Sequence, residues 1–247
     1  MNNKTSKISS IIYNDRSTWE DKIFITFDMD WCNDEILSFV LDIVKKYKIS
    51  STFFVTHYTP LLEELRKYDY IELGIHPNFN FLLQGDFKYG GSYKEVVEFF
   101  LNIVPEAVTV RSHSITHNTY ISNFWANKGI KYECNCFIPV YSDIILKPFQ
   151  RRDNRITIVP YFWEDDVFLI SNDIQDIKKY ISYPGLKVFD FHPIHIYLNT
   201  DSMYRYNQAK KYINSNKQED IEKLRKLINE KNYGIRDVFL QLIENIL

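Results

Sequence analysis

The 247-residue sequence has almost no surplus of charge, with 30 Lys and Arg residues against 32 Asp and Glu residues and a formal net charge of −2. Proteins that bind DNA or RNA neutralise phosphates with clustered Lys and Arg, so we expect no nucleic-acid partner. No apolar run approaches the roughly 20 residues that span a bilayer, so no transmembrane segment is predicted. Residues 1–10 are polar and lack the apolar segment of a secretory signal, which favours a cytoplasmic protein.

Cysteine and glycine are scarce as well. The three cysteines, Cys32, Cys134 and Cys136, are too few for a disulfide framework and agree with a reducing compartment. Cys134 and Cys136 lie two residues apart in a predicted strand, and we interpret them as structural thiols rather than metal ligands. Neither Gly-x-Gly-x-x-Gly nor Gly-x-x-x-x-Gly-Lys-Ser/Thr occurs among the 7 glycines, which argues against a nucleotide-binding open sheet.

Hydrophobic residues are abundant, at 45% of the chain, and aromatic residues reach 16%. This composition excludes a disordered or low-complexity chain, and the length suits one large α/β domain. The 18 Phe, 18 Tyr and 4 Trp residues indicate a large core and a composition bias, and by themselves they do not indicate a function.

Short strand-like runs alternate with segments of helical spacing from residue 23 onward. The predicted strands are 23–27, 52–55, 71–75, 107–110, 130–137, 156–161 and 187–191. The predicted helices are 35–47, 60–68, 93–104, 122–128, 174–181, 219–228 and 235–247, and the polar stretch 199–218 is predicted to be a mobile loop or lid. Repeated βα units predict parallel strands with right-handed crossovers, and a (β/α) barrel is favoured over an open doubly wound sheet.

Polar side chains with catalytic potential follow the carboxyl ends of the predicted strands, which converge on one face of a barrel. They are Asp28 and Asp30 after the first strand, His76 after the third, Arg111 after the fourth and His192 after the last. Further polar candidates at or just past the ends of predicted strands are His57, His113, residues 163–166 and His195. One active face is therefore expected, and it requires a single domain.

Asp28 and Asp30 lie two apart in an extended segment, so their carboxylates point the same way and repel each other. A metal ion on one and an arginine on the other resolves the conflict, and Arg111 is the natural partner of Asp28. The alternative is a pair of solvated loop acids or helix-capping acids. His76 has the chemistry of a zinc ligand, although a lone histidine at a strand end is more often a hydrogen-bonded structural group.

The remaining candidates are weaker. His195 is interpreted either as a group that supports the site from behind or as a substrate contact, and His57 as a residue at the rim. Trp31, Tyr161, Phe162 and Trp163 are candidates to stack on the apolar face of a sugar ring. The default interpretation of Trp163 is a residue of the wall or core.

Five segments together resemble the polysaccharide deacetylase superfamily (NodB homology, carbohydrate esterase family 4), and in particular its WbmS-like branch, which is associated with surface-polysaccharide synthesis. The segments, which occur in the family's order within residues 22–200, are Thr26-Phe27-Asp28-Met29-Asp30, Ser51-Thr52-Phe53-Phe54-Val55, Gly74-Ile75-His76, Arg111-Ser112-His113-Ser114 and Phe191-His192-Pro193.

The resemblance implies an α/β fold, a distorted (β/α)7–8 TIM-like barrel of the NodB type, as one domain over residues 1–247. The core would cover about residues 22–200, followed by a C-terminal loop and closing helices over 201–247. It also implies one divalent metal ion, usually zinc, and removal of an acetyl group from an N-acetylated sugar. Carried over by position, Asp28 is the general base, Arg111 orients it, Asp30 and His76 bind the metal, and His192 is the general acid.

The chain departs from the family at two positions. Asn80 stands where a second metal histidine is usual, so either Asn80 binds the metal weakly or another group does, and His113 is the preferred replacement. Asn80 is otherwise a substrate-contact candidate. Ser114 stands where the family's arginine motif carries a tyrosine.

Three functions follow as hypotheses. The first is a metal-dependent deacetylase acting on an N-acetyl sugar in a glycan or in a nucleotide- or lipid-linked precursor. The alternative is a catalytically degenerate barrel that binds a glycan or a protein partner, suggested by Asn80 and Ser114. A mononuclear iron oxygenase with two histidines and a carboxylate ranks lower, because that chemistry is usually built on antiparallel barrels.

Overall fold

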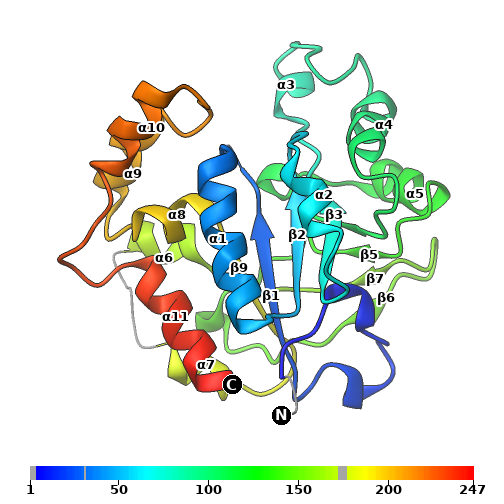
Figure 1. The fold of residues 1–247 in the computed structure, drawn as a ribbon. Helices are drawn as coiled ribbons and strands as arrows, with labels where there is room; N and C mark the ends of the chain where they lie inside the picture. The colour runs from blue at the N-terminus through cyan, green and yellow to red at the C-terminus, as the bar shows by residue number, and fades with distance from the viewer. Residues whose placement is uncertain (1–3, 31, 172–176) are drawn as a thin grey trace.

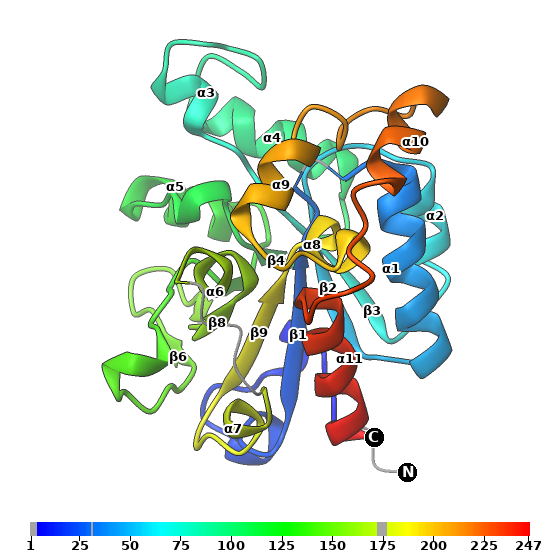
Figure 2. The same cartoon turned by 90° about the vertical axis from the view of Figure 1, so that its left-hand side faces the viewer.

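A computed structural model describes residues 4–30, 32–171 and 177–247. Nine strands form one sheet in the order β6-β7-β5-β4-β3-β2-β1-β9-β8, and every pairing is parallel except that of β6 with β7. The strands are β1 (Ile23–Asp28), β2 (Ser51–Val55), β3 (Ile71–Ile75), β4 (Thr109–Val110), β5 (Tyr132–Glu133), β6 (Phe149–Gln150), β7 (Thr157–Ile158), β8 (Trp163–Glu164) and β9 (Lys187–Phe191). The sheet curls, with helices on its outside (Figures 1 and 2), and this confirms the predicted distorted (β/α) barrel.

The central strands β1, β2, β3 and β9 are buried along their whole length, as expected for parallel strands covered on both faces. Phe27 of β1 pairs in register with Phe53 of β2 and Phe191 of β9. The Phe27 and Phe53 rings stack with centroids 4.5 Å apart. Part of the aromatic content therefore fills the core, as the composition suggested.

Helices connect and cover the strands. Their bounds are α1 (Asp34–Tyr47), α2 (Leu61–Leu65), α3 (Asn80–Leu83), α4 (Tyr93–Ile103), α5 (Thr119–Asn127), α6 (Asp165–Ser171), α7 (Lys178–Ile181), α8 (Pro193–Leu198), α9 (Met203–Ala209), α10 (Gln218–Arg225) and α11 (Ile235–Ile246). Capping residues define both ends of helix α1. The Asn33 side chain accepts a hydrogen bond from the Ile36 amide at 3.0 Å, and Lys48 ends the helix in a left-handed conformation. In the described part of the chain, no helix has the length and apolarity needed to cross a membrane.

Several predicted elements need correction. The predicted strands 130–137 and 156–161 shorten to Tyr132–Glu133 and Thr157–Ile158. The stretch 199–218, predicted as a loop, contains α9, because Tyr206 and Ala209 are buried against the body of the protein. The predicted helix 174–181 begins outside the described residues, and only Lys178–Ile181 is seen as helix.

Candidate metal-dependent active site

The carboxyl ends of neighbouring parallel strands deliver the predicted side chains to one place. Asp28 ends β1, His76 follows β3, Arg111 follows β4 and His192 follows β9. Register aligns these ends, since Asp28 pairs with Phe54 of β2, and Ile75 pairs with Val110. All four residues, together with Asp30, line one pocket of about 260 Å³. The predicted convergence on one face is therefore present.

Asp30, His76 and His113 form a compact set of potential metal ligands. His113 Nδ1 lies 2.8 Å from Asp30 Oδ2, and His76 Nε2 lies 3.5 Å from the same oxygen. One ligand atom from each of the three residues lies within 4.8 Å of the others. Nitrogen and carboxylate oxygen donors in this number suit a divalent ion such as zinc, with a further position open.

His76 supplies the test of whether these residues fit a metal. Its side chain is 2% exposed, and neither ring nitrogen has a hydrogen-bond partner among the described residues. A buried imidazole without hydrogen bonds is costly, because its polar atoms have lost their hydrogen bonds to water. The carboxylates of Asp28 and Asp30, 3.6 and 3.5 Å from its nitrogens, offset this cost only through their charge. Coordination to a cation would satisfy one nitrogen, so the residues present fit a metal site.

The electrostatics of this set keep Asp30 ionised. Burial raises the pKa of the Asp30 carboxyl, but His76 and His113 outweigh burial and hold that pKa well below its usual range. Burial lowers the pKa of His76, and the carboxylates of Asp28 and Asp30 more than compensate and raise it. A site with this concentration of carboxylate charge favours a cation.

Arg111 holds Asp28 in place from inside the core. Its guanidinium is 1% exposed, and Nη1 donates to Asp28 Oδ1 at 3.0 Å and to Thr26 Oγ1 at 3.0 Å. Nη1 also forms an ion pair with Asp190. Arg111 thus bridges two buried carboxylates, which explains how a charge is tolerated at this depth.

His192 is held by a carboxylate that comes from the start of α6. His192 Nδ1 lies 2.7 Å from Asp165 Oδ1, and the His192 backbone amide donates to Asp165 Oδ2 at 2.7 Å. Burial lowers the pKa of His192, but Asp165 and Asp166 raise it well above its ordinary value. His192 Nε2 is left facing the metal-ligand set, 4.0 Å from Asp30 Oδ2.

His113 is placed by an unusual turn. The two residues that follow it, Ser114 and Ile115, have φ values of 54° and 47°. This left-handed conformation is strained for a β-branched residue, and such strain concentrates at functional sites. The His113 amide donates to the Pro77 carbonyl at 3.0 Å, which ties the turn to the segment after His76.

Comparison with known proteins identifies the family. The family model described as WbmS-like polysaccharide deacetylase matches residues 25–210. The chain belongs to this family. A crystal structure of a WbmS protein from Bordetella bronchiseptica, described as a polysaccharide deacetylase involved in O-antigen biosynthesis, has 35% identity and a TM-score of 0.90 over 99% of both chains.

A second solved structure, described as a polysaccharide deacetylase from Mycobacterium smegmatis, has 13% identity and a TM-score of 0.48, and the match covers 96% of this chain and 93% of that chain. Comparison with curated proteins finds no match. The family model and the Bordetella bronchiseptica structure confirm the resemblance inferred from the five sequence segments at the level of the family.

The weaker candidates of this WbmS-like chain lie around the pocket rather than in it. His195 is 1% exposed and sits behind the site, with Nε2 2.7 Å from Asp166 and Nδ1 3.1 Å from Thr200 Oγ1. Asn80 begins α3, its amide donates to Ser114 Oγ at 3.1 Å, and it is not among the described residues that line the metal-site pocket. Trp31 lies outside the described residues.

Trp163 needs a correction as a sugar-stacking candidate. Its side chain is fully buried, stacks on Phe168 with centroids 5.0 Å apart and packs against Phe191. The ring is therefore enclosed by other aromatic side chains. Trp163 belongs to the core, which was its default interpretation, and it is not exposed to stack on a sugar. The aromatic side chains that do line the pocket are Phe137 and Tyr161.

Sequence reasoning gave no role to Asp165 and did not notice Asp190. Asp190 carried a usable signal, since it is an acid in the middle of the apolar run Val188-Phe189-Asp190-Phe191, and a buried charge needs a partner. Asp165 and Asp166 lay in a segment already noted at a strand end, but nothing in their spacing linked them to His192 and His195.

Proposed function

We propose that this chain is a metal-dependent deacetylase that hydrolyses the N-acetyl group of an amino sugar in a surface polysaccharide or its precursor. The observation that carries the proposal is His76, a buried imidazole beside Asp30 and His113 with no hydrogen bond to either ring nitrogen from the described residues. Membership of the family and the description of the Bordetella bronchiseptica relative support the substrate class.

The proposed ligands are Asp30, His76 and His113. A divalent ion bound by them would polarise the acyl oxygen and lower the pKa of water, which are the two tasks that amide hydrolysis needs from a metal. Zinc is the proposed ion, because two imidazoles and one carboxylate match its preferred donors.

The other roles fall to Asp28 and His192, which lie at the ends of the neighbouring strands β1 and β9 and have ligand atoms within 4.8 Å of each other. Asp28, oriented by Arg111, accepts a proton as water adds to the acyl carbon. His192, oriented by Asp165, donates a proton to the nitrogen as the carbon–nitrogen bond breaks. The products are acetate and the free amino sugar, and Ser114 supplies no tyrosine-like contact to the developing oxyanion.

We further propose that residues 1–247 act as one domain, since a continuous cluster of buried side chains extends from Ile8 to Ile246. A cytoplasmic location stays a prediction from the sequence.

The test is elemental analysis together with an acetate-release assay on the purified chain. We expect about one zinc or similar ion per chain and release of acetate from N-acetylated sugars. Asp30→Ala should lose the metal, whereas His192→Ala should keep the metal and lose turnover. Full deacetylase activity in metal-free protein would overturn the mechanism. Failure to bind any metal in the presence of zinc would favour the binding-module alternative.

A further inference from the structure

A cluster of two histidines and two aspartates lies beside the proposed metal site. Asp165 and Asp166 begin α6, His192 directly precedes α8, and His195 lies in the first turn of α8. These helices follow β8 and β9, which pair in parallel, so the two segments leave the same edge of the sheet. One ligand atom from each of the four residues lies within 4.8 Å of the other three. The fold therefore gathers a second set of potential metal ligands.

Two short hydrogen bonds organise this cluster. His192 Nδ1 lies 2.7 Å from Asp165 Oδ1, and His195 Nε2 lies 2.7 Å from Asp166 Oδ1. The two imidazole rings pack edge to face with their centroids 5.8 Å apart. The first pair orients the proposed proton donor, whereas the pair of His195 and Asp166 has no part in the proposed mechanism.

The donors of the cluster have the composition and spacing of a zinc site. Two imidazole nitrogens and two carboxylate oxygens supply the four ligands of a tetrahedral ion. Zinc bonds of about 2.0–2.2 Å hold tetrahedral ligand atoms about 3.3–3.5 Å apart, so each atom of the cluster needs to move by about 1 Å or less. Because zinc ligands must be unprotonated, the ion takes the place of the proton in each pair and releases it to solvent.

An ion can reach the cluster from the metal-site pocket, the cavity of about 260 Å³ that holds Asp30 and His76. Asp166 and His192 line this pocket, and the Asp166 side chain is 34% exposed. The ligands on the far side, from Asp165 and His195, are buried. The cluster is thus open to solvent through the pocket and closed behind it.

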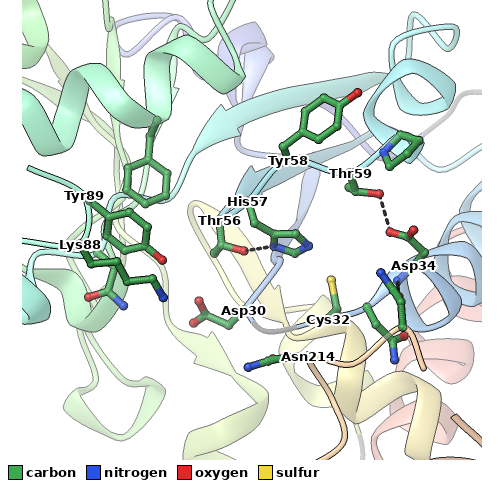
Figure 3. A pocket seen from close by; sticks show the side chains of 15 residues that line it. Asp30, Cys32, Asp34, Thr56, His57, Tyr58, Thr59, Lys88, Tyr89 and Asn214 are labelled. Atoms are coloured by element: carbon green, nitrogen blue, oxygen red, sulfur yellow. Dashed lines mark hydrogen bonds between the residues drawn. The ribbon is translucent and has the colours of Figure 1, made fainter. Parts of the chain in front are cut away.

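His57, a further histidine near the metal site, is not part of such a set. It lines a neighbouring cavity of about 290 Å³ together with Asp30 and Asp34. Figure 3 shows His57 hydrogen-bonded to Thr56 and Asp34 hydrogen-bonded to Thr59, so each turns toward its own partner. Among the described residues, His57 belongs to no group of three or more potential ligands within 4.8 Å of one another. A histidine near two aspartates is therefore not sufficient.

Another group, Asp28, Asp190 and His192, has the spacing of a metal site but already holds a cation. The Arg111 guanidinium forms ion pairs with both of these carboxylates, so a second cation would be repelled there. In contrast, the ion pairs of Asp165 and Asp166 within the described chain are with His192 and His195 alone. Two carboxylates beside two neutral imidazoles leave two negative charges, which a divalent ion balances.

We propose that Asp165, Asp166, His192 and His195 form a second zinc site, weaker than the first, and that its occupation inhibits the enzyme. The site is weaker because the ion must replace two hydrogen bonds, whereas His76 in the first site has none to lose among the described residues. An imidazole that binds zinc cannot also become protonated, so His192 can no longer act as the general acid. The inhibition rests on the proposed deacetylase function, whereas the site itself does not.

Equilibrium dialysis against low and high free zinc, followed by elemental analysis, counts the ions that the full chain binds. We expect about one zinc ion per chain at low free zinc and about two at high free zinc. His195→Gln and Asp166→Asn should each lower the affinity for the second ion by about tenfold or more, because each removes a ligand. His117→Gln changes an exposed histidine outside the cluster and should bind both ions, so it is the matched control. Circular dichroism checks that each variant is folded.

Acetate release at the same two zinc concentrations tests the inhibition. In the wild type and in His117→Gln, the rate should fall by about tenfold or more at high free zinc, since a general acid contributes about 10²–10⁴-fold. In His195→Gln and Asp166→Asn, the rate should fall much less. Each variant is compared with its own rate at low free zinc, which removes any change in its basal activity.

A chain that still binds only one zinc ion at high free zinc would overturn the second site and leave the deacetylase intact. A second ion that both ligand variants retain would also overturn it, because that ion is bound elsewhere. A second ion that both variants lose, without any effect on the rate, would support the site and reject the inhibition. Absence of acetate release at either zinc concentration would reject the deacetylase, while the zinc count would still decide the second site.

Discussion

Asp165 holds His192 with both of its carboxylate oxygens: Oδ1 lies 2.7 Å from the ring Nδ1, and Oδ2 accepts the His192 backbone amide at 2.7 Å. The two contacts fix the imidazole and the backbone that carries it, although 27 residues separate the pair. With Nδ1 engaged, Nε2 is the nitrogen that faces the pocket. This arrangement suits a proton donor whose orientation must be maintained through the reaction.

Replacing this carboxylate tests that role. Asp165→Asn should lower kcat by about 10²–10⁴-fold, the usual contribution of a general acid or base, because Asn has one accepting oxygen and cannot accept from both the His192 ring Nδ1 and the His192 backbone amide. Metal content should be unchanged. Steady-state kinetics and elemental analysis check both statements, with Asp153→Asn on the exposed surface as the control. Wild-type turnover in Asp165→Asn would exclude His192 as a general acid positioned by Asp165.

The third metal ligand is tested by a pair of histidine variants. His113→Ala should lower zinc affinity by at least about tenfold, since it removes the imidazole 2.8 Å from Asp30. His117→Ala removes an exposed imidazole four residues away and should leave the affinity unchanged. Competition with a fluorescent chelator measures both affinities. If His113→Ala binds zinc as tightly as the wild type, another residue completes the site.

Gly74 tests how tightly the strand that leads to His76 is packed. A Cβ at Gly74 would lie 2.4 Å from Thr109 Oγ1 and 2.8 Å from Phe54 Cδ1, both in buried residues. Gly74→Ala should therefore lower the free energy of unfolding by about 1–3 kcal/mol through overpacking. It should also weaken metal binding, because His76 lies two residues further along.

Gly91→Ala is the matched control, since a Cβ there meets its nearest atom at 3.7 Å. Urea denaturation of both variants compares their stabilities. Equal stability of Gly74→Ala and the wild type would show that β3 and β4 can separate at no cost.

The ion pair of Asp201 with Arg205 predicts a pH dependence of stability. The hydrogen bond from Arg205 lowers the pKa of the Asp201 carboxyl from 3.8 to about 2. Because the folded pKa is the lower one, the stabilisation is present above the unfolded pKa and is lost as the pH falls through the folded pKa. We expect Asp201→Asn to cost about 1 kcal/mol at pH 7, since the pair is partly exposed.

The difference between Asp201→Asn and the wild type should shrink as the pH falls from about 4 toward about 2. Urea denaturation at several pH values measures it, with Asp42→Asn, whose side chain is 72% exposed, as the control. A difference that stays constant with pH would mean that the Asp201 carboxylate contributes nothing through its charge.

Much of the fold could be predicted from local patterns. The strands Ile71–Ile75 and Lys187–Phe191 have the predicted bounds, and the end of β1 differs from its prediction by one residue. These strands are mostly apolar and buried on both faces, so the apolar run in the sequence is enough to predict them. The short strands β6 and β8 could not be predicted, because two-residue strands have no periodicity and exist only through their neighbours.

Helix α9 is another element that local sequence patterns could not predict. Its sequence, Met203–Ala209, is polar enough to suggest a loop, yet Tyr206 packs on the His195 ring with centroids 4.7 Å apart. The contact joins segments whose proximity depends on the whole fold. Tertiary packing, rather than helical propensity, therefore decides this element.

By itself, the sequence determined the alternation of strands and helices and the polar residues at the strand ends, because these depend on neighbouring positions in the chain. It also identified Asp28 and Arg111 as partners, since a charge buried at a strand end requires an opposite charge. The tertiary structure alone decided that Asp165 holds His192 and that Asp190 shares Arg111. It also places His113, the candidate that the sequence favoured over Asn80, beside Asp30. Those pairings join residues far apart in the sequence, and they are selected by burial and the curl of the sheet, which no local pattern encodes.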